Sequence, residues 1–202
     1  MQTKTLALAM PLICLLSCGT VKDIPTGTRS SQADPAEAMA KISKAARLGP
    51  QHDKMAALAG SWDLQFKHRA GAGADAEWVT ETGTADCRVV LGGRYLVEEL
   101  KCTYDGAPYE GIRVHGFDNL EGTYFNIWMD TVGTWPVLSR GATDDADALV
   151  YHGRWKDIHT PSGRPFRTVA KRDGDDKWQL ELFDTIDGAE VKILEATYTR
   201  RK

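Results

Sequence analysis

The strongest constraint on the fold of this chain is an alternation of apolar and polar residues with a period of two, which begins at Ser61 and continues to the C-terminus. In residues 124–130 one face would carry Phe125, Ile127 and Met129, and the other Tyr124, Asn126 and Trp128. About ten such segments are separated by turn signals such as Asp105-Gly106 and Asp187-Gly188. The pattern predicts an all-β antiparallel barrel or sandwich, and closure into a barrel would remove exposed strand edges.

The first residues carry the features of an export signal. Lys4 is followed by an apolar run over residues 6–16, which is shorter than the roughly 18 residues that a membrane-spanning helix needs. Residues 1–17 are therefore predicted to be a signal peptide. The run ends in Leu15-Leu16-Ser17-Cys18-Gly19, which resembles the lipobox of bacterial lipoproteins. That resemblance implies cleavage after Ser17 and acylation of Cys18.

A plain secretory signal with an incidental cysteine is the alternative to the lipobox. If the lipobox is correct, the chain is exported and held at the periplasmic face of a membrane through lipidated Cys18. Gly19 rather than Asp follows the cysteine. By resemblance to Gram-negative sorting, this favours the outer membrane over the inner membrane.

A tether and two helices are predicted between the signal and the strands. Residues 18–33 are rich in Ser, Thr, Gly and Pro, which is typical of a flexible linker. Residues 34–58 are predicted to be helical, with Asp34 as the N-cap and Gly49-Pro50 separating a first helix from a second over residues 52–58. Apolar side chains at Met39, Ile42 and Ala46 share one face of the first helix. Residues 59–202 form the barrel domain.

Composition and motifs exclude several classes of function. A net charge of −3 without a basic patch gives no support for a nucleic-acid partner. The five histidines lack metal-ligand spacing, and His115, alone on a strand, is expected to be a half-buried polar residue. No nucleophile elbow, glycine fingerprint or other catalytic constellation is present. The sequence thus predicts no metal or cofactor and does not favour an enzyme, and it leaves the oligomeric state open.

The order and spacing of several short segments resemble a family of bacterial proteins. These segments are 35–39, Gly49-Pro50-Gln51-His52-Asp53-Lys54, Leu58-Ala59-Gly60-Ser61-Trp62, 91–96, Gly116-Phe117-Asp118-Asn119, Trp128-Met129-Asp130-Thr131 and 195–202. The chain is similar to the uncharacterised DUF1579 family from residue 35 to its end. The resemblance implies a lipocalin-like (calycin-like) antiparallel β-barrel of about ten strands, preceded by a short N-terminal helical segment. It implies no established activity.

Trp62 and Arg200 are expected to have a structural role. Trp62 opens the first strand and Arg200 lies near the end of the last. The pair is similar to the lipocalin arrangement in which a late arginine stacks over an early tryptophan and closes the barrel floor. Such a cation–π contact is worth roughly 0.5–2 kcal/mol.

Charged residues within the strands are the candidates for ligand binding. Glu98, Glu99, Glu110, Arg113 and Asp130 interrupt apolar segments, and one of the two adjacent glutamates must face the lumen unless a bulge intervenes. An exterior, solvated position for most of them is the alternative. Candidate ligand-binding residues are Trp128, Arg113, Asp130, Glu98 and Tyr124.

Two functions remain open at this stage, because the alternation does not show which face of residues 124–130 is the lumen. The first is the binding of a small amphipathic or hydrophobic molecule inside the barrel. The second is a structural or interaction scaffold of the cell envelope with a filled barrel and no ligand. An empty lumen of several hundred Å³ would favour the first.

Cys87 and Cys102 are predicted not to form a disulfide. A two-residue turn at Gly92-Gly93 would place Cys87 opposite Glu98, so that Cys102 lies four residues further along, roughly 13 Å away. A disulfide needs Cα atoms within about 7 Å. Only a longer loop or a bulge could bring the two cysteines together.

Replacement of Cys18 by Ser should move the protein from the membrane fraction to the soluble fraction, because the acyl chains would lose their attachment point. Fractionation of cells followed by immunoblotting measures this directly. Cys14→Ser, in the same signal segment, is the matched control and should leave the distribution unchanged. A Cys18→Ser variant that stays membrane-bound at wild-type levels contradicts the lipobox assignment.

Overall fold

The computed structural model describes residues 34–71, 73–157 and 160–202. It has two helices and ten strands: α1 (Pro35–Ala45), α2 (Pro50–Ala56), β1 (Gly60–Arg69), β2 (Trp78–Val90), β3 (Tyr95–Tyr104), β4 (Ala107–Asp118), β5 (Thr123–Asp130), β6 (Val137–Thr143), β7 (Leu149–Trp155), β8 (Arg164–Arg172), β9 (Lys177–Ile186) and β10 (Ala189–Arg200).

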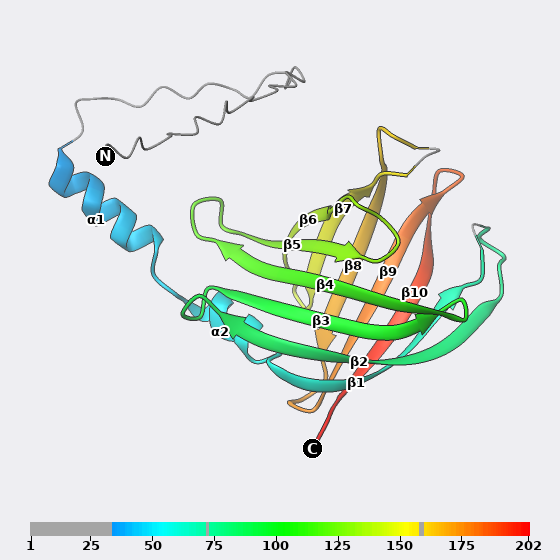
Figure 1. The fold of residues 1–202 in the computed structure, drawn as a ribbon. Helices are drawn as coiled ribbons and strands as arrows, with labels where there is room; N and C mark the ends of the chain where they lie inside the picture. The colour runs from blue at the N-terminus through cyan, green and yellow to red at the C-terminus, as the bar shows by residue number, and fades with distance from the viewer. Residues whose placement is uncertain (1–33, 72, 158–159) are drawn as a thin grey trace, which may run out of the picture.

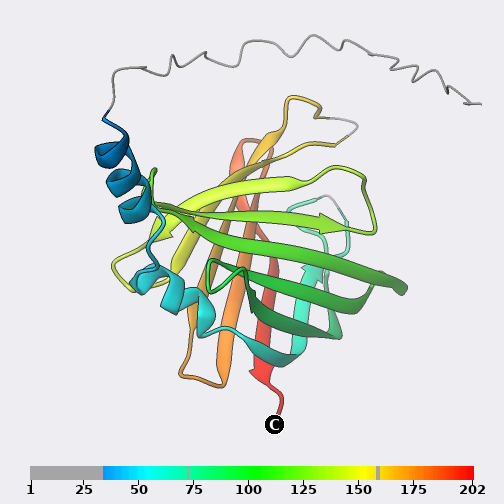
Figure 2. The same cartoon turned by 60° about the vertical axis from the view of Figure 1, so that its left-hand side comes forward.

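The strands form one closed antiparallel barrel. Each strand pairs with the next along the chain, and β1 pairs with β10 to close the sheet. Figures 1 and 2 show β1–β5 curving around one side and β6–β10 around the other, with the helices outside one end. The predicted all-β, ten-stranded barrel with an N-terminal helical segment is confirmed. The second helix begins at Pro50 rather than at residue 52, because proline suits the first position of a helix.

Turn chemistry sets the strand register. Asp105-Gly106 and Asp187-Gly188 both have positive φ at each residue, as a two-residue hairpin turn requires. At Gly92-Gly93 the prediction of a two-residue turn is wrong: Val90 pairs with Tyr95, so four residues connect β2 and β3. Leu91 also adopts a positive φ, and the backbone N–H groups of Gly93 and Arg94 both donate to the Val90 carbonyl.

The longer connection keeps the register that the shorter turn would give. Cys87 lies opposite Glu98, whereas Cys102 lies opposite Gly83. Both cysteines are free, as predicted.

The lumen side of each strand carries the core. Its buried members include Leu64, Phe66, Leu96, Leu100, Tyr151, Leu180 and Tyr198. On β5 the buried side chains are Tyr124 and Asn126, so the mixed face of that strand points inward. The sequence pattern had left this choice open.

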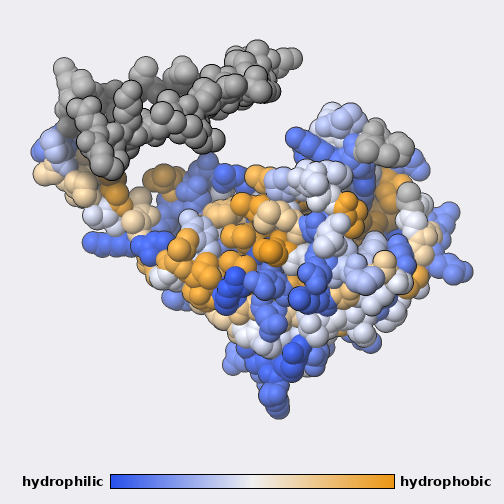
Figure 3. All heavy atoms as spheres, in the orientation of Figure 1, coloured by the Kyte–Doolittle hydropathy of each residue, from blue (hydrophilic) through white to orange (hydrophobic). Residues whose placement is uncertain are grey.

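The outer face of β4–β6 is also apolar, which explains the ambiguity. Ile112 lies opposite Met129 across β4 and β5, and both side chains are exposed. Leu138 on β6 is 58% exposed. Apolar side chains gather over this side of the barrel in Figure 3. Hydrophobicity alone therefore could not separate inside from outside on these strands.

Trp62, Arg200 and α2 close one end of the barrel. Trp62 is buried, and its indole Nε1 donates to the Leu58 carbonyl at 3.0 Å. The Arg200 guanidinium carbon lies 4.2 Å from the centre of the Trp62 ring, which is the stacking that the resemblance implies. Arg200 also donates to the carbonyls of Ala57 and Ala59, so it joins the end of α2 to the last strand.

Helix α1 projects away from the barrel, as Figure 1 shows. Asp34 accepts a hydrogen bond from the Ala36 backbone at 2.9 Å and caps the helix as predicted. Met39 and Ile42, on the expected apolar face, are each 60% exposed. The side chain of Asn119 holds the end of the helix by donating to the Ala45 and Arg47 carbonyls. Within the described residues, no helix is long and apolar enough to cross a membrane.

Trp62→Ala should lower the free energy of unfolding by about 3–5 kcal/mol, since truncation of a large buried aromatic side chain leaves a cavity. It also removes the surface on which Arg200 stacks. Urea denaturation followed by circular dichroism gives the value. Trp135→Ala, at an exposed position, is the control and should change stability by less than about 1 kcal/mol. A similarly small effect for Trp62→Ala would show that Trp62 does not anchor the closed end.

Candidate functional site

A cavity of about 330 Å³ lies inside the barrel at the end opposite α2. Its walls differ in chemistry. The side formed by β4–β6 contributes Arg113, Asn126, Trp128 and Ser139, whereas β8–β10 contribute mainly apolar side chains such as Leu180 and Leu194. An adjoining space of about 90 Å³ leads deeper, between Leu100 and Tyr198. The lumen is therefore hollow and two-sided, with most of its polar groups along the β4–β6 wall.

At the base of this cavity, Glu98 and Arg113 form a buried ion pair. They are register partners on β3 and β4, with Glu98 Oε2 and Arg113 Nη1 3.2 Å apart. The Glu98 side chain is 1% exposed. Tyr198 donates its hydroxyl proton to Glu98 Oε1 at 3.0 Å, and His115 Nε2 lies 3.7 Å from Oε2. Glu98 is thus the inward member of the Glu98–Glu99 pair.

Electrostatics keep this pair charged. Burial alone would raise the pKa of Glu98, but the Arg113 charge, His115 and the Tyr198 hydroxyl outweigh it and hold the pKa below its ordinary value. Burial would lower the pKa of Arg113, but the Glu98 carboxylate outweighs it and raises that pKa. Burial lowers the pKa of His115, which favours a neutral imidazole. The base of the lumen therefore holds one carboxylate and one guanidinium.

Trp128 is held in place by Asp130 and Arg113. Its indole Nε1 donates to Asp130 Oδ2 at 2.8 Å, and the Arg113 guanidinium carbon lies 4.7 Å from the indole centre. Tyr109 donates its hydroxyl to the same Asp130 oxygen, at 2.9 Å. A Cβ at Gly111 would come within 2.3 Å of the indole, so the glycine on β4 is what allows the ring to lie there.

Asp130 also fixes the loop between β5 and β6. Its Oδ1 accepts from the backbone of Val132 at 2.9 Å and of Gly133 at 3.3 Å. Both carboxylate oxygens are therefore occupied by donors, and the indole of Trp128 is joined to the rim of the barrel.

Several buried polar atoms along the cavity have no hydrogen-bond partner among the described residues. They include Arg113 Nε and Nη1 and Asn126 Oδ1. Arg113 Nη1 contacts Glu98 without hydrogen-bond geometry. Buried polar groups are ordinarily hydrogen-bonded, so such a cluster in a cavity indicates a place where a ligand group or water would be received.

The five candidate ligand-binding residues are not all brought together. Arg113, Trp128 and Asp130 line the cavity, and Glu98 lies directly behind Arg113. Tyr124 faces inward but at the closed end, where it packs against Phe117. Glu99 and Glu110 are exposed on the outside, where they pair with Arg88 and Lys101.

Sequence reasoning missed the other side chains that complete the base of the lumen, namely His115, Tyr151 and Tyr198. Each lies at an inward position of its strand, so strict alternation extended along β4, β7 and β10 could have found them. His115 is buried beside Glu98 rather than half-buried. In the described residues no group of three or more His, Cys, Asp or Glu side chains is arranged to hold a metal ion.

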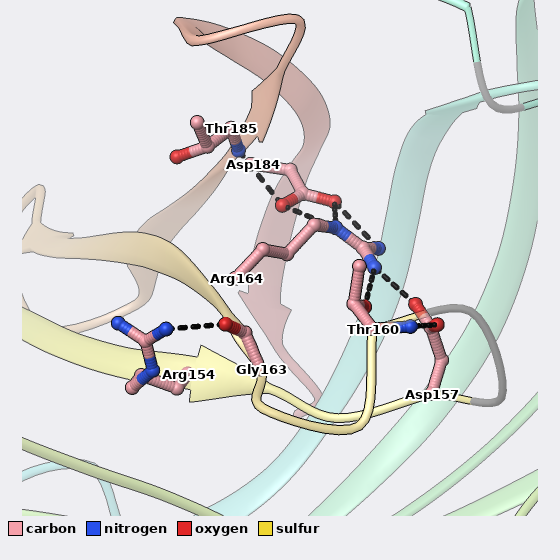
Figure 4. A network of polar contacts seen from close by, with 7 residues as sticks. All are labelled: Arg154, Asp157, Thr160, Gly163, Arg164, Asp184 and Thr185. Atoms are coloured by element: carbon pink, nitrogen blue, oxygen red, sulfur yellow. Dashed lines mark hydrogen bonds and ion pairs between the residues drawn. The ribbon is translucent and has the colours of Figure 1, made fainter.

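A polar network stiffens the rim on the β8–β9 side. Arg164 Nε lies 2.9 Å from both carboxylate oxygens of Asp184, and its other end contacts Asp157 and the Thr160 hydroxyl. Figure 4 shows the guanidinium between the two carboxylates. Asp184 is buried and also accepts from the Thr185 backbone. The network joins the β7–β8 loop to β9 beside the mouth of the cavity.

Comparisons with known proteins identify the same barrel. The family described as "Protein of unknown function (DUF1579)" matches residues 47–200, which include α2 and all ten strands but not α1. No curated protein matches the chain. Among solved structures, the chain is similar to Rv2717c from M. tuberculosis, at 14% identity and a TM-score of 0.57, over 77% of this chain and 100% of that one. At this identity the likeness concerns the fold alone.

Glu98→Gln should destabilise the protein by about 3–5 kcal/mol at neutral pH, because it leaves the Arg113 charge buried without its partner. Glu99→Gln, on the adjacent exposed position, should cost about 1 kcal/mol or less. Urea denaturation followed by tryptophan fluorescence compares the two variants.

The loss of stability caused by Glu98→Gln should also depend on pH. Since the folded-state pKa of Glu98 is lowered, its contribution is present above the ordinary glutamate pKa and is lost as pH falls through the folded-state value. The loss of stability caused by Glu98→Gln should therefore become smaller as pH falls below the ordinary glutamate pKa. Equal effects of the two substitutions would contradict the buried ion pair.

Proposed function

The chain belongs to the DUF1579 family of proteins of unknown function, and we propose that it is a membrane-anchored envelope lipoprotein whose barrel binds a small amphipathic molecule. The anchor in this proposal is Cys18, which lies outside the described residues. The binding site is the cavity between β4–β6 and β8–β10.

One observation carries the proposal: the lumen is hollow and has unlike walls. Leu180 and Leu194 offer an apolar surface, and Arg113 and Asn126 face it with buried polar atoms that lack hydrogen-bond partners in the described part of the chain. A volume of about 330 Å³ lies within the range of small-molecule sites. A molecule with an apolar body and a polar end would cover the first wall and satisfy the second.

The alternative, a filled scaffold without a ligand, has less support. A scaffold barrel would have side chains packed across its lumen, and its buried polar atoms would be paired with one another. The base of the lumen does fit that description, since Glu98 contacts both Arg113 and Tyr198. The cavity above them does not, and its hollow form favours binding.

The aromatic side chains that border the cavity suit a flat or ring-containing ligand. Tyr109 and Trp128 stack with ring centres 6.4 Å apart, and Tyr104 stacks on His68 at 4.2 Å. All four rings border the cavity. Offset stacking on such rings contributes about 0.5–1.5 kcal/mol beyond the burial of apolar area.

Native mass spectrometry of the purified protein, mixed with extracts of envelope lipids and metabolites, should reveal a bound small molecule. Trp128→Ala and Arg113→Ala should each weaken its retention by about tenfold or more, because one removes buried aromatic surface and the other a buried donor. Trp135→Ala and Arg140→Ala, at exposed positions, are the matched controls.

Two results would count against the proposal. If folded Trp128→Ala and Arg113→Ala retain the molecule as wild type does, the site lies elsewhere. If the wild-type protein retains nothing from any extract, the scaffold alternative takes its place.

A further inference from the structure

We infer that the molecule bound in the lumen is uncharged at its polar end and presents there both a hydrogen-bond acceptor and a donor, as a primary amide does. This inference rests on the proposed function and specifies its ligand class. Three features of the cavity support it: the charge balance around Arg113, the occupied oxygens of Asp130, and the unpartnered atoms on β4 and β5.

The charge balance disfavours an anionic ligand. Arg113 is the only Lys or Arg among the described residues that line the cavity, and the buried Glu98 carboxylate already lies 3.2 Å from it. Asp130 adds a second carboxylate on the same wall. A carboxylate ligand would share one guanidinium with these two negative charges in a poorly hydrated space, where such repulsion is strong and loss of hydration is costly.

A cationic end is disfavoured for a different reason. Both oxygens of Asp130 are occupied by Tyr109, Trp128 and two backbone donors, so they offer little to an ammonium group. The Arg113 guanidinium also covers the face of Trp128 that would otherwise attract a cation. An ammonium group would carry only donors and could not satisfy the unpartnered donors of Arg113.

The unpartnered atoms define the remaining requirement. Arg113 Nε is a buried donor and Asn126 Oδ1 a buried acceptor, and neither has a partner among the described residues. Arg113 lies opposite Trp128, and His115 lies opposite Asn126, so Arg113 and Asn126 are diagonal neighbours on β4 and β5. Diagonal neighbours have Cα atoms about 7–8 Å apart, which lets one functional group seated between them accept from one and donate to the other.

Four naphthalene probes separate these possibilities, because they share one ring system that suits the aromatic wall. They are 2-naphthamide, 2-naphthoate, 2-naphthylmethylammonium and 2-acetonaphthone, which offers an acceptor without a donor. Isothermal titration calorimetry with the full-length protein at neutral pH measures each affinity. The amide should bind at least about tenfold more tightly than either charged probe, and also more tightly than the ketone.

Two variants test the physical cause. Glu98→Gln removes the counter-charge of Arg113 and should reverse the order, so that the naphthoate binds more tightly than the naphthamide. The control Glu99→Gln should leave the order unchanged, since Glu99 faces outward. Asn126→Leu removes the acceptor and should abolish the advantage of the amide over the ketone. This second variant keeps the test decisive if Glu98→Gln fails to fold.

The outcomes separate this inference from the proposed function. A naphthoate affinity equal to or above that of the naphthamide in wild type overturns the inference while leaving a ligand-binding barrel. An unchanged order in folded Glu98→Gln does the same. If none of the four probes binds wild type, the ligand class is wrong, and the experiment with envelope extracts decides the proposed function separately.

Discussion

Glu98 and Arg113 face each other across β3 and β4, with carboxylate and guanidinium 3.2 Å apart in the interior of the barrel. A single buried charge would be costly, and the pair is tolerable only because register holds the partners together and Tyr198 adds a hydrogen bond. The pair determines what surrounds it: Trp128 lies against the guanidinium, and Asp130 fixes the indole from its other edge. The polar wall of the cavity is built outward from this ion pair.

Closure of the sheet is what allows a polar wall and an apolar wall to coexist in one small lumen. Every strand has two neighbours, so the backbone needs no hydrogen bonds from the interior. The closed end is completed by Trp62, Arg200 and α2, and the open end is stiffened by the Arg164 network and by Asp130. The cavity between them is open at one end only.

Alternation and Asp-Gly turns were sufficient to predict about ten antiparallel strands in a barrel or sandwich, because both are local signals, and the resemblance to the DUF1579 family pointed to the barrel. The sequence also predicted that Cys87 would lie opposite Glu98, although the loop at Gly92-Gly93 is longer than expected. It could not choose the inner face of β5, since Ile112 and Met129 make the outer face apolar as well. It could not show that Tyr198 meets Glu98, because that contact joins β3 and β10, which lie far apart in the chain. Tyr124 was a candidate ligand-binding residue because alternation puts it on the same face as Trp128. It does face inward, but it lies at the closed end of the barrel, where it packs against Phe117.

The central claim is that the lumen is built around a Glu98 carboxylate that stays ionised while buried. The most direct test is an NMR titration that follows the side-chain carboxyl carbon of Glu98, assigned by comparison with Glu98→Gln. The account predicts that its chemical shift still has the ionised value at the ordinary glutamate pKa and changes only at lower pH. A Glu98 that takes up a proton at or above the ordinary glutamate pKa in the folded protein would contradict the account.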